Sequence, residues 1–251
     1  MTPASTTGPR VFRMTIDWAD YGAVLFDLDG VITPTAEVHM RAWSAMFNGF
    51  LDAHGHTPAY TDRDYFDYVD GKPRYDGVRS FLASRGIELP EGTPEDPPDE
   101  ETVCGLGNSK NDAFGEVLRS EGVAPYPGSL ALVQQLAERG MPLAIVSSSR
   151  NAPDVLAAAD VAGYFPVVID GRVAGERGLP GKPAPDTYWA GADDLGVERG
   201  RAVVVEDAIS GVAAGAAGDF ALVIGVDRGT GADELTAAGA DLVVSDLGEL
   251  L

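Results

Sequence analysis

Two aspartates near the N-terminus follow an apolar run and are separated by one residue. The run is residues 23–26 (AVLF), and Asp27, Leu28, Asp29 and a glycine come directly after it. An uninterrupted apolar run predicts a strand buried on both faces, so the two carboxylates fall at its carboxyl end. Ligands bind at that end in open α/β sheets, and two acids this close repel unless a cation or a proton lies between them. The alternative is a polar strand end that turns at glycine.

Polar residues follow two further apolar runs, and a lysine lies between these runs in the chain. Residues 143–146 lead into a Ser-Ser-Ser-Arg-Asn segment, residues 202–205 lead into Glu206 and Asp207, and Lys182 lies in a Gly-Lys-Pro segment. Taken singly, the serines could cap a helix, the lysine could be a surface charge, and the acids could favour the start of a helix. Together, at the carboxyl ends of parallel strands, they supply carboxylates, hydroxyl donors and a fixed cation at one edge of a sheet.

This set suits the attack of a carboxylate on a phosphate ester. The nucleophile and the ester carry charge of the same sign, so the phosphoryl oxygens must be neutralised before the two can approach. We expect Mg2+ in that role, because it prefers oxygen ligands and no soft ligand is near in the sequence. The expected ligands are Asp27, Glu206 and Asp207, and the expected neutralising side chains are Lys182 and Ser147. The second aspartate of the first segment then delivers or removes a proton.

The composition excludes several classes of partner. The chain has 251 residues, 45% of them hydrophobic, which is enough for one large core with a smaller attached domain. Asp and Glu outnumber Lys and Arg by 39 to 18, and a formal charge of −21 repels nucleic acid and anionic membranes. The single cysteine, Cys104, excludes an intrachain disulfide and fits a reducing cytosol. With no apolar stretch typical of a signal or a membrane span, we expect a cytoplasmic monomer that binds small phosphorylated molecules.

Apolar strand candidates alternate with helical patterns over much of the chain. The strand candidates are residues 23–26, 143–146, 167–169, 202–205, 221–224 and 242–244. This alternation predicts an α/β fold, a Rossmann-like parallel sheet covered by helices on both faces. We assign residues 20–36 and 126–251 to this core and residues 1–19 to an N-terminal tail.

Residues 37–125 interrupt this alternation with helical patterns. One buried helix face, beginning near Glu37, is predicted by apolar residues three or four positions apart: Met40, Trp43, Met46 and Phe47. Two more amphipathic stretches span residues 75–85 and 101–120, and the acidic, proline-rich segment 88–99 between them predicts a surface loop. The sequence therefore predicts a small helical module inserted into the core.

Taken in order, the four polar segments resemble the four motifs of the haloacid dehalogenase superfamily of phosphotransferases. These segments are DLDG at 27–30, Ser147 after a strand, Lys182-Pro183 and Glu206-Asp207. The resemblance runs from about Tyr21 to the C-terminus, and the helical insertion is similar to the mobile cap of that superfamily. FDLDGVIT, the cap segment 109–112, GKPAPD and VEDAISG further resemble its mutases, which interconvert β-glucose 1-phosphate and glucose 6-phosphate through a bisphosphate.

The resemblance implies a role for each matching residue. Asp27 becomes the aspartyl phosphate, Asp29 acts as general acid and base, and Ser147 and Lys182 contact the transferring phosphoryl group. The implied metal ligands are Asp27, the backbone carbonyl of Asp29, Glu206 and Asp207. The implied substrate-binding residues are His39, Gly71, Arg74, Lys110, Asn111, Ser149, Arg150 and Asn151. The alternative for His39 is a histidine at a helix surface or an interface.

Two positions depart from the pattern of those mutases. Pro34 stands in the hinge into the cap where an acid is usual, and Arg150 replaces a usual lysine while keeping its charge. A second Gly-Lys-Pro, around Lys72, lies within the cap, and we interpret Lys72 as part of a loop, or at most as a contact on the substrate side. The rival functions are a Mg2+-dependent sugar-phosphate phosphatase on the same scaffold and a binding module that has lost catalysis. The presence of both Asp27 and Asp29 argues against the binding module.

Overall fold

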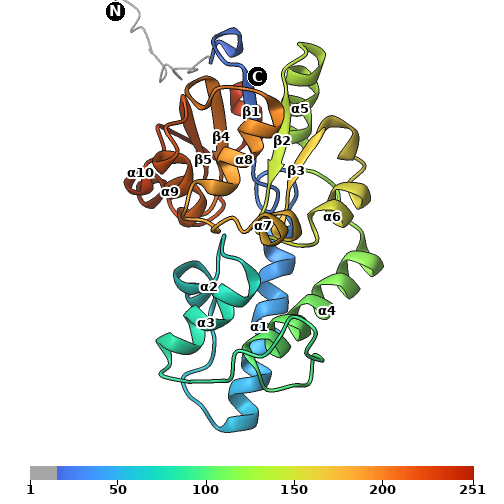
Figure 1. Ribbon diagram of the computed structural model, residues 1–251, viewed down its shortest axis with the longest axis vertical. Coiled ribbons are helices and arrows are strands. Elements are labelled where there is room, and N and C mark those ends of the chain that lie inside the picture. The colour runs from blue at the N-terminus through green and yellow to red at the C-terminus, as the bar shows by residue number, and fades with distance from the viewer. Residues whose placement is uncertain (1–15) are drawn as a thin grey trace, which may run out of the picture.

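A parallel sheet of six strands forms the centre of the part of the chain that the structure describes, residues 16–251 of a computed structural model (Figure 1). The strands are β1 (Ala23–Phe26), β2 (Leu143–Val146), β3 (Val167–Ile169), β4 (Ala202–Glu206), β5 (Leu222–Val226) and β6 (Leu242–Val244). Their order across the sheet is β3-β2-β1-β4-β5-β6, and each neighbouring pair is parallel. The α/β fold with a Rossmann-like sheet is therefore confirmed.

The predicted strands agree with the observed ones at most positions. The predicted run 202–205 extends by one residue, so Glu206 belongs to β4. The run predicted at 221–224 is placed too early, because the strand begins at Leu222 and continues through Gly225 to Val226.

Helices cover both faces of the sheet. In the core they are α5 (Pro127–Glu138), α6 (Ala152–Ala158), α7 (Gly171–Arg177), α8 (Asp186–Leu195), α9 (Ile209–Ala217) and α10 (Ala232–Ala238). Val24 and Phe26 of β1 pack in one apolar cluster with α5 and α6, whereas Ala23 and Leu25 pack in another with α8, α9 and α10. Period-two alternation along the strand therefore sends side chains to both faces, as expected for a doubly covered sheet.

Residues 1–15 of the predicted N-terminal tail lie outside the described residues. Trp18, which belongs to the same predicted tail, forms part of a 3-10 helix (Trp18–Asp20) and is 2% exposed in the core of the sheet. The core therefore includes a side chain that precedes residue 20.

The inserted helical cap consists of α1 (Thr35–His54), α2 (Asp62–Tyr68), α3 (Arg74–Ser84) and α4 (Val103–Glu121). Figure 1 shows these helices below the sheet, with α1 leading away from it and α4 leading back. Trp43, Met46 and Phe47 are buried in the apolar cluster of the cap itself, and Met40 packs against that cluster. We propose residues 37 and 125 as the limits of the cap, close to the start of α1 and the end of α4.

Helix α2 is absent from the sequence prediction. It has only seven residues, DRDYFDY, and it begins with a capping box in which the side chains of Thr61 and Asp64 bond to each other's backbone N–H groups. In residues 16–251, no helix is both long enough and apolar enough to cross a membrane.

We expect the substitution Phe47→Ala to destabilise the cap by about 3–5 kcal/mol, the usual cost of emptying a buried aromatic site. Phe47 is fully buried, and its ring lies 5.3 Å from that of Trp43, 5.0 Å from that of Tyr60 and 4.2 Å from that of Phe81. Urea unfolding followed by circular dichroism would measure the loss. Leu251→Ala, at a side chain that is 47% exposed, is the control and should change the unfolding free energy little. Equal effects of the two substitutions would contradict the packing argument.

Candidate active site

The strand order places the candidate site at the carboxyl ends of β1 and β4. Phe26 lies opposite Val205 in the ladder, and the N–H of Asp27 donates to the Val205 carbonyl at 2.9 Å. Asp27 is the first residue after β1, so it lies beside Glu206, the last residue of β4. The strand order of the sheet reverses between these two strands, which is where open α/β sheets bind ligands.

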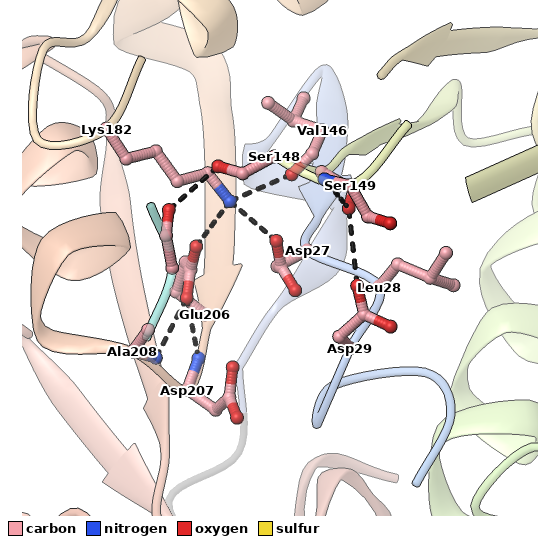
Figure 2. Close-up of polar contacts among 12 residues, drawn as sticks. Asp27, Leu28, Asp29, Val146, Ser148, Ser149, Lys182, Glu206, Asp207 and Ala208 are labelled. Atoms are coloured by element: carbon pink, nitrogen blue, oxygen red, sulfur yellow. Dashed lines mark hydrogen bonds and ion pairs between the residues drawn. The ribbon is translucent and has the colours of Figure 1, made fainter. Parts of the chain in front are cut away.

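Figure 2 shows the side-chain nitrogen of Lys182 bonded to both carboxylates, Asp27 and Glu206. Its Nζ donates to Asp27 Oδ1 at 2.5 Å, to Glu206 Oε1 at 2.6 Å and to the Val146 carbonyl at 2.9 Å. The residue is only 3% exposed. Burial lowers the pKa of a lysine, but the charges of Asp27 and Glu206 outweigh burial and raise the pKa of Lys182. The lysine therefore stays charged throughout the neutral range.

Three buried carboxylates converge beside this lysine. Asp27, Glu206 and Asp207 each offer an oxygen, and these oxygens lie within 4.8 Å of one another. Burial, followed by the charges of neighbouring carboxylates, raises the pKa of Asp207 well above its ordinary value. A cation among the three oxygens would reverse that shift. This donor set consists of oxygen alone, which suits a hard divalent cation such as Mg2+.

Two glycines allow the carboxylates to approach the backbone. Gly30 has a φ of +91°, and a Cβ there would lie 1.9 Å from Asp207 Oδ2. A Cβ on Gly211, in the first turn of α9, would lie 1.7 Å from Glu206 Oε1. The other oxygen of Glu206 accepts from the N–H groups of Asp207 and Ala208, both at 2.9 Å. These glycines are therefore required by the geometry of the acids.

Asp29 is held by groups different from those that hold Asp27. The Thr35 hydroxyl donates to Asp29 Oδ1, the Ser147 hydroxyl donates to Oδ2 at 3.4 Å, and His39 Nε2 lies 3.3 Å from Oδ1. Burial favours the protonated acid, but the charge and hydrogen bond of His39, together with Thr35, lower the pKa of Asp29 to about 2. Pro34 makes no side-chain cap at the start of α1, and its neighbour Thr35 provides the contact between hinge and acid.

A buried pair on the cap extends this network. Lys110 Nζ contacts His39 Nδ1, and the imidazole stacks on Phe114 with ring centroids 4.0 Å apart. Burial, followed by the charge of Lys110, lowers the pKa of His39. Burial, followed by the charge of Arg74, lowers the pKa of Lys110 to about 7. Because His39 is 8% exposed and faces Asp29, a position at an exposed helix surface is excluded, whereas the interpretation as an interface histidine stays open.

The far side of the pocket carries two arginines, one from the cap and one from the core. Arg74 Nη2 donates to Asn111 Oδ1 at 2.6 Å, and Asn151 Nδ2 donates to the same oxygen at 2.7 Å. Burial and then the nearby charge of Arg150 are the two causes that lower the pKa of Arg74. Two guanidinium groups that repel each other across a pocket favour an anion between them.

Most of the residues predicted from the sequence line a single pocket between the sheet and the cap. They are Asp27, Asp29, His39, Gly71, Arg74, Lys110, Ser147, Ser149, Arg150, Asn151, Glu206 and Asp207. Lys182 and Asn111 do not line it. Lys182 is buried and bonds to Asp27, and Asn111 accepts hydrogen bonds from Arg74 and Asn151. Lys72 also lines the pocket, although its Nζ is engaged by the Tyr68 carbonyl and the Ser80 hydroxyl within the cap.

Two residues that line the pocket, Asp70 and Ser148, and one that bonds to Asp70 from outside it, Ser210, were not predicted from the sequence. Asp70 lines the pocket, and burial is the main cause that raises its pKa to about 7. The Ser148 hydroxyl donates to the Gly71 carbonyl at 2.7 Å, and the Ser210 hydroxyl donates to the Asp70 carbonyl at 3.1 Å. The resemblance pointed to Gly71 in this loop, but the Asp-Gly pair at 70–71 is typical of an ordinary turn, so nothing marked Asp70 itself.

We expect Lys110 to make the folding stability rise with pH between about 7 and 10.5. The unfolded chain binds a proton at Lys110 below its ordinary pKa of 10.5, whereas the folded chain binds it only below about 7. Above pH 10.5 the lysine is neutral in both states and does not reduce the free energy of unfolding. As the pH falls from 10.5 toward 7, the free energy of unfolding decreases by about 1.4 kcal/mol per pH unit for one proton.

Urea midpoints measured across this range should rise less steeply in Lys110→Met than in the wild type. Arg119→Met removes one positive charge from the exposed face of the same helix and is the control. Parallel curves for the wild type and Lys110→Met would contradict the lowered pKa.

Known proteins resemble this chain over most of its length. A model of the haloacid dehalogenase-like hydrolase family matches residues 21–219. The β-phosphoglucomutase of Mycobacterium tuberculosis is 48% identical over 239 residues, which is 91% of each chain. Hexitol phosphatase A of Escherichia coli is 32% identical over 202 residues, which is 77% of each chain.

A solved structure of the β-phosphoglucomutase of Clostridium difficile has the same fold. It matches with a TM-score of 0.73 and 22% identity, covering 92% of this chain and 93% of the other. The structural match concerns the fold, and the sequence matches concern the family. The chain is therefore an enzyme of the haloacid dehalogenase superfamily, as the order of its four motifs predicted.

Proposed function

We propose that the chain is a β-phosphoglucomutase that interconverts β-D-glucose 1-phosphate and glucose 6-phosphate. The reaction passes through an aspartyl-phosphate enzyme and β-glucose 1,6-bisphosphate. The 48% identical mutase of M. tuberculosis supports this choice of substrate class. The single observation that carries it is the second cationic site, where Arg74 of the cap and Arg150 of the core face one pocket.

A mutase needs that second site because its intermediate has two phosphates. While one phosphoryl group is at Asp27, the other must be held at the far end of the sugar. A guanidinium suits this task, since it binds phosphate oxygens in a bidentate manner. A phosphatase that acts on monophosphates has no such requirement.

Asp27 is the proposed nucleophile. One of its carboxylate oxygens forms a bond to phosphorus while the bond from phosphorus to the sugar oxygen breaks, and Asp29 supplies the proton that the departing oxygen takes. In the other step Asp29 removes a proton from the free hydroxyl of a sugar monophosphate. That oxygen then takes the phosphoryl group from Asp27, which frees the Asp27 carboxylate and forms the bisphosphate. Lys182 and Ser147 neutralise the phosphoryl oxygens.

Asp27, Glu206, Asp207 and the backbone carbonyl of Asp29 are the proposed ligands of Mg2+. When bound, the ion would supply positive charge that reduces the repulsion between the phosphoryl oxygens and the three carboxylates. The convergence of the three buried carboxylates, Asp27, Glu206 and Asp207, supports the assignment.

The second candidate is a Mg2+-dependent sugar-phosphate phosphatase on the same scaffold. The 32% identity to hexitol phosphatase A supports it. The two reactions share the aspartyl phosphate and differ in whether a sugar hydroxyl or water accepts the phosphoryl group. A closed cap favours the mutase, because it excludes water from the phosphoenzyme.

Asp27→Asn should abolish turnover, because an amide cannot form the acyl phosphate. Incubation with acetyl phosphate, followed by mass spectrometry of the intact protein, should detect a phosphorylated wild type and no phosphorylated variant. Thermal unfolding would verify that the variant is folded. A phosphorylated Asp27→Asn protein would show that the nucleophile is another residue.

The product ratio separates mutase from phosphatase. Wild-type enzyme given β-glucose 1-phosphate with a trace of the bisphosphate should form glucose 6-phosphate much faster than free phosphate. Arg74→Ala should lower mutase turnover or raise KM by about ten- to a hundredfold, the effect of losing a charge-assisted contact of about 1.5–3 kcal/mol.

Arg79→Ala is the matched control for this experiment. Arg79 lies on the same helix α3, but it pairs with Asp76 and Glu91 at an exposed position, so its loss should leave the kinetics unchanged. If phosphate release dominates in the wild type and Arg74→Ala behaves like Arg79→Ala, the phosphatase is the better assignment.

A further inference from the structure

The two aspartates of the first motif are held by different parts of the fold. Asp27 is fixed by its backbone bond to β4 and by the ammonium of Lys182. Asp29 lies two residues further on, in the loop that leads to the cap. Its side chain has the contacts already described, but the direction from which the acid approaches them depends on what holds the backbone of that loop.

An arginine from a distant segment bonds to the residue directly after Asp29. Arg228 lies in the loop after β5, and its Nε donates to the Gly30 carbonyl at 2.9 Å. Nearly two hundred residues separate the two in sequence, and Arg228 belongs to none of the four motifs. Gly30 in turn packs against Asp207, where no Cβ could be accommodated. The arginine thus bonds to a residue that follows Asp29 in its loop and packs against Asp207, the residue directly after β4.

The guanidinium of Arg228 is itself held on three sides. Its Nη1 donates to the Ser245 carbonyl at 2.9 Å, and its Cζ lies 3.8 Å from the centroid of the Tyr126 ring. The side chain is 19% exposed. The N–H of Tyr126 donates to the Ile32 carbonyl at 2.9 Å, so the stacked ring belongs to the segment that bonds to the same catalytic loop. Such contacts fix a planar group in one orientation.

The backbone of the loop that carries Arg228 is held by hydrogen bonds within the loop. Asp227 Oδ1 accepts from the N–H of Gly229 at 2.9 Å and from the N–H of Gly231 at 3.0 Å. In the same loop the Thr230 hydroxyl donates to the Asp207 carbonyl at 3.3 Å. One loop therefore contacts the backbone at two neighbouring residues beside the site, Gly30 and Asp207.

We propose that Arg228 is a positioning residue for Asp29, because it fixes the Gly30 carbonyl and with it the loop that aims the acid. The proposal rests on the proposed role of Asp29 as the proton donor and acceptor. Arg228 is not among the residues that line the pocket, and it acts through the backbone alone. A misplaced acid slows the steps that need proton transfer, whereas a nucleophile held by Lys182 and the sheet keeps its place.

Two phosphoryl donors separate these effects. Acetate leaves acetyl phosphate without needing a proton, so phosphorylation of Asp27 by acetyl phosphate does not require Asp29. A sugar oxygen needs that proton. In Arg228→Met, sugar-phosphate turnover should therefore fall by about ten- to a hundredfold in kcat with little change in KM, the scale of a small misplacement. The rate of Asp27 phosphorylation by acetyl phosphate should match that of the wild type.

Three other variants complete the experiment. Asp29→Asn should show the same split between the two donors. Arg228→Lys keeps the charge but cannot donate to two carbonyls in one plane, so its kcat should lie between those of the wild type and Arg228→Met. If Arg228→Met does not fold, Arg228→Lys takes its place in the comparison with the wild type. Arg199→Met is the control, because Arg199 also stacks on an aromatic ring, at 4.4 Å from that of Trp189, and should change neither rate.

The outcomes distinguish this proposal from the proposed function. If Asp29→Asn splits the two donors and the Arg228 variants lower both rates equally, or neither, the positioning role is overturned and the function stands. If Asp29→Asn itself fails to split the donors, the proposed role of Asp29 falls and the role of Arg228 falls with it. The proposal is supported if Asp29→Asn and Arg228→Met both lose sugar-phosphate turnover while keeping phosphorylation by acetyl phosphate, and if Arg228→Lys recovers part of the turnover.

Discussion

The burial of several carboxylates around one lysine is the constraint on which the site depends. Asp27, Glu206 and Asp207 are at most 7% exposed, and the ammonium of Lys182 is the cation that bonds to two of them. Burying a charge is costly unless a partner of opposite sign lies against it, and one lysine cannot neutralise three acids. The remaining negative charge makes this end of the sheet a place for a cation, and in turn for a phosphoryl group held by it.

The sheet could be predicted from sequence because its strands are buried on both faces. An apolar run such as residues 143–146 then appears without interruption, and the predicted limits match β2. The end of β5 was missed because Gly225 breaks the apolar run. In the structure that glycine packs closely, since a Cβ there would lie 3.3 Å from both Leu235 and Ala240. Strand β5 continues past this glycine because of tertiary packing, which cannot be predicted from a local sequence pattern.

Site residues could be predicted where their own side chains suit the proposed chemistry. Residues that act through hydrogen bonds to the backbone of others were not predicted. Asp27, Lys182 and Glu206 are charged residues at strand ends or in a recognisable segment, so type and position pointed to them. Arg228 bonds to a carbonyl, and a carbonyl belongs to every residue, so its partner leaves no trace in the sequence. Asp70 and Ser210 were missed for a related reason, since their loops come together only when the cap and the core are in contact.

The placement of positive charge links the binding of phosphate to closure of the cap. The chain carries a formal charge of −21, so attraction of an anion depends on local cations and not on the field of the whole molecule. Arg74 and Lys110 belong to the cap, whereas Arg150 and Lys182 belong to the core. Neither half alone surrounds a bisphosphate. Full binding energy is therefore available only when the halves meet, and the same contact brings His39 and Lys110 against Asp29. In the proposed mutase, a substrate with two phosphates would thus select the state in which His39 lies against Asp29, the proposed proton donor.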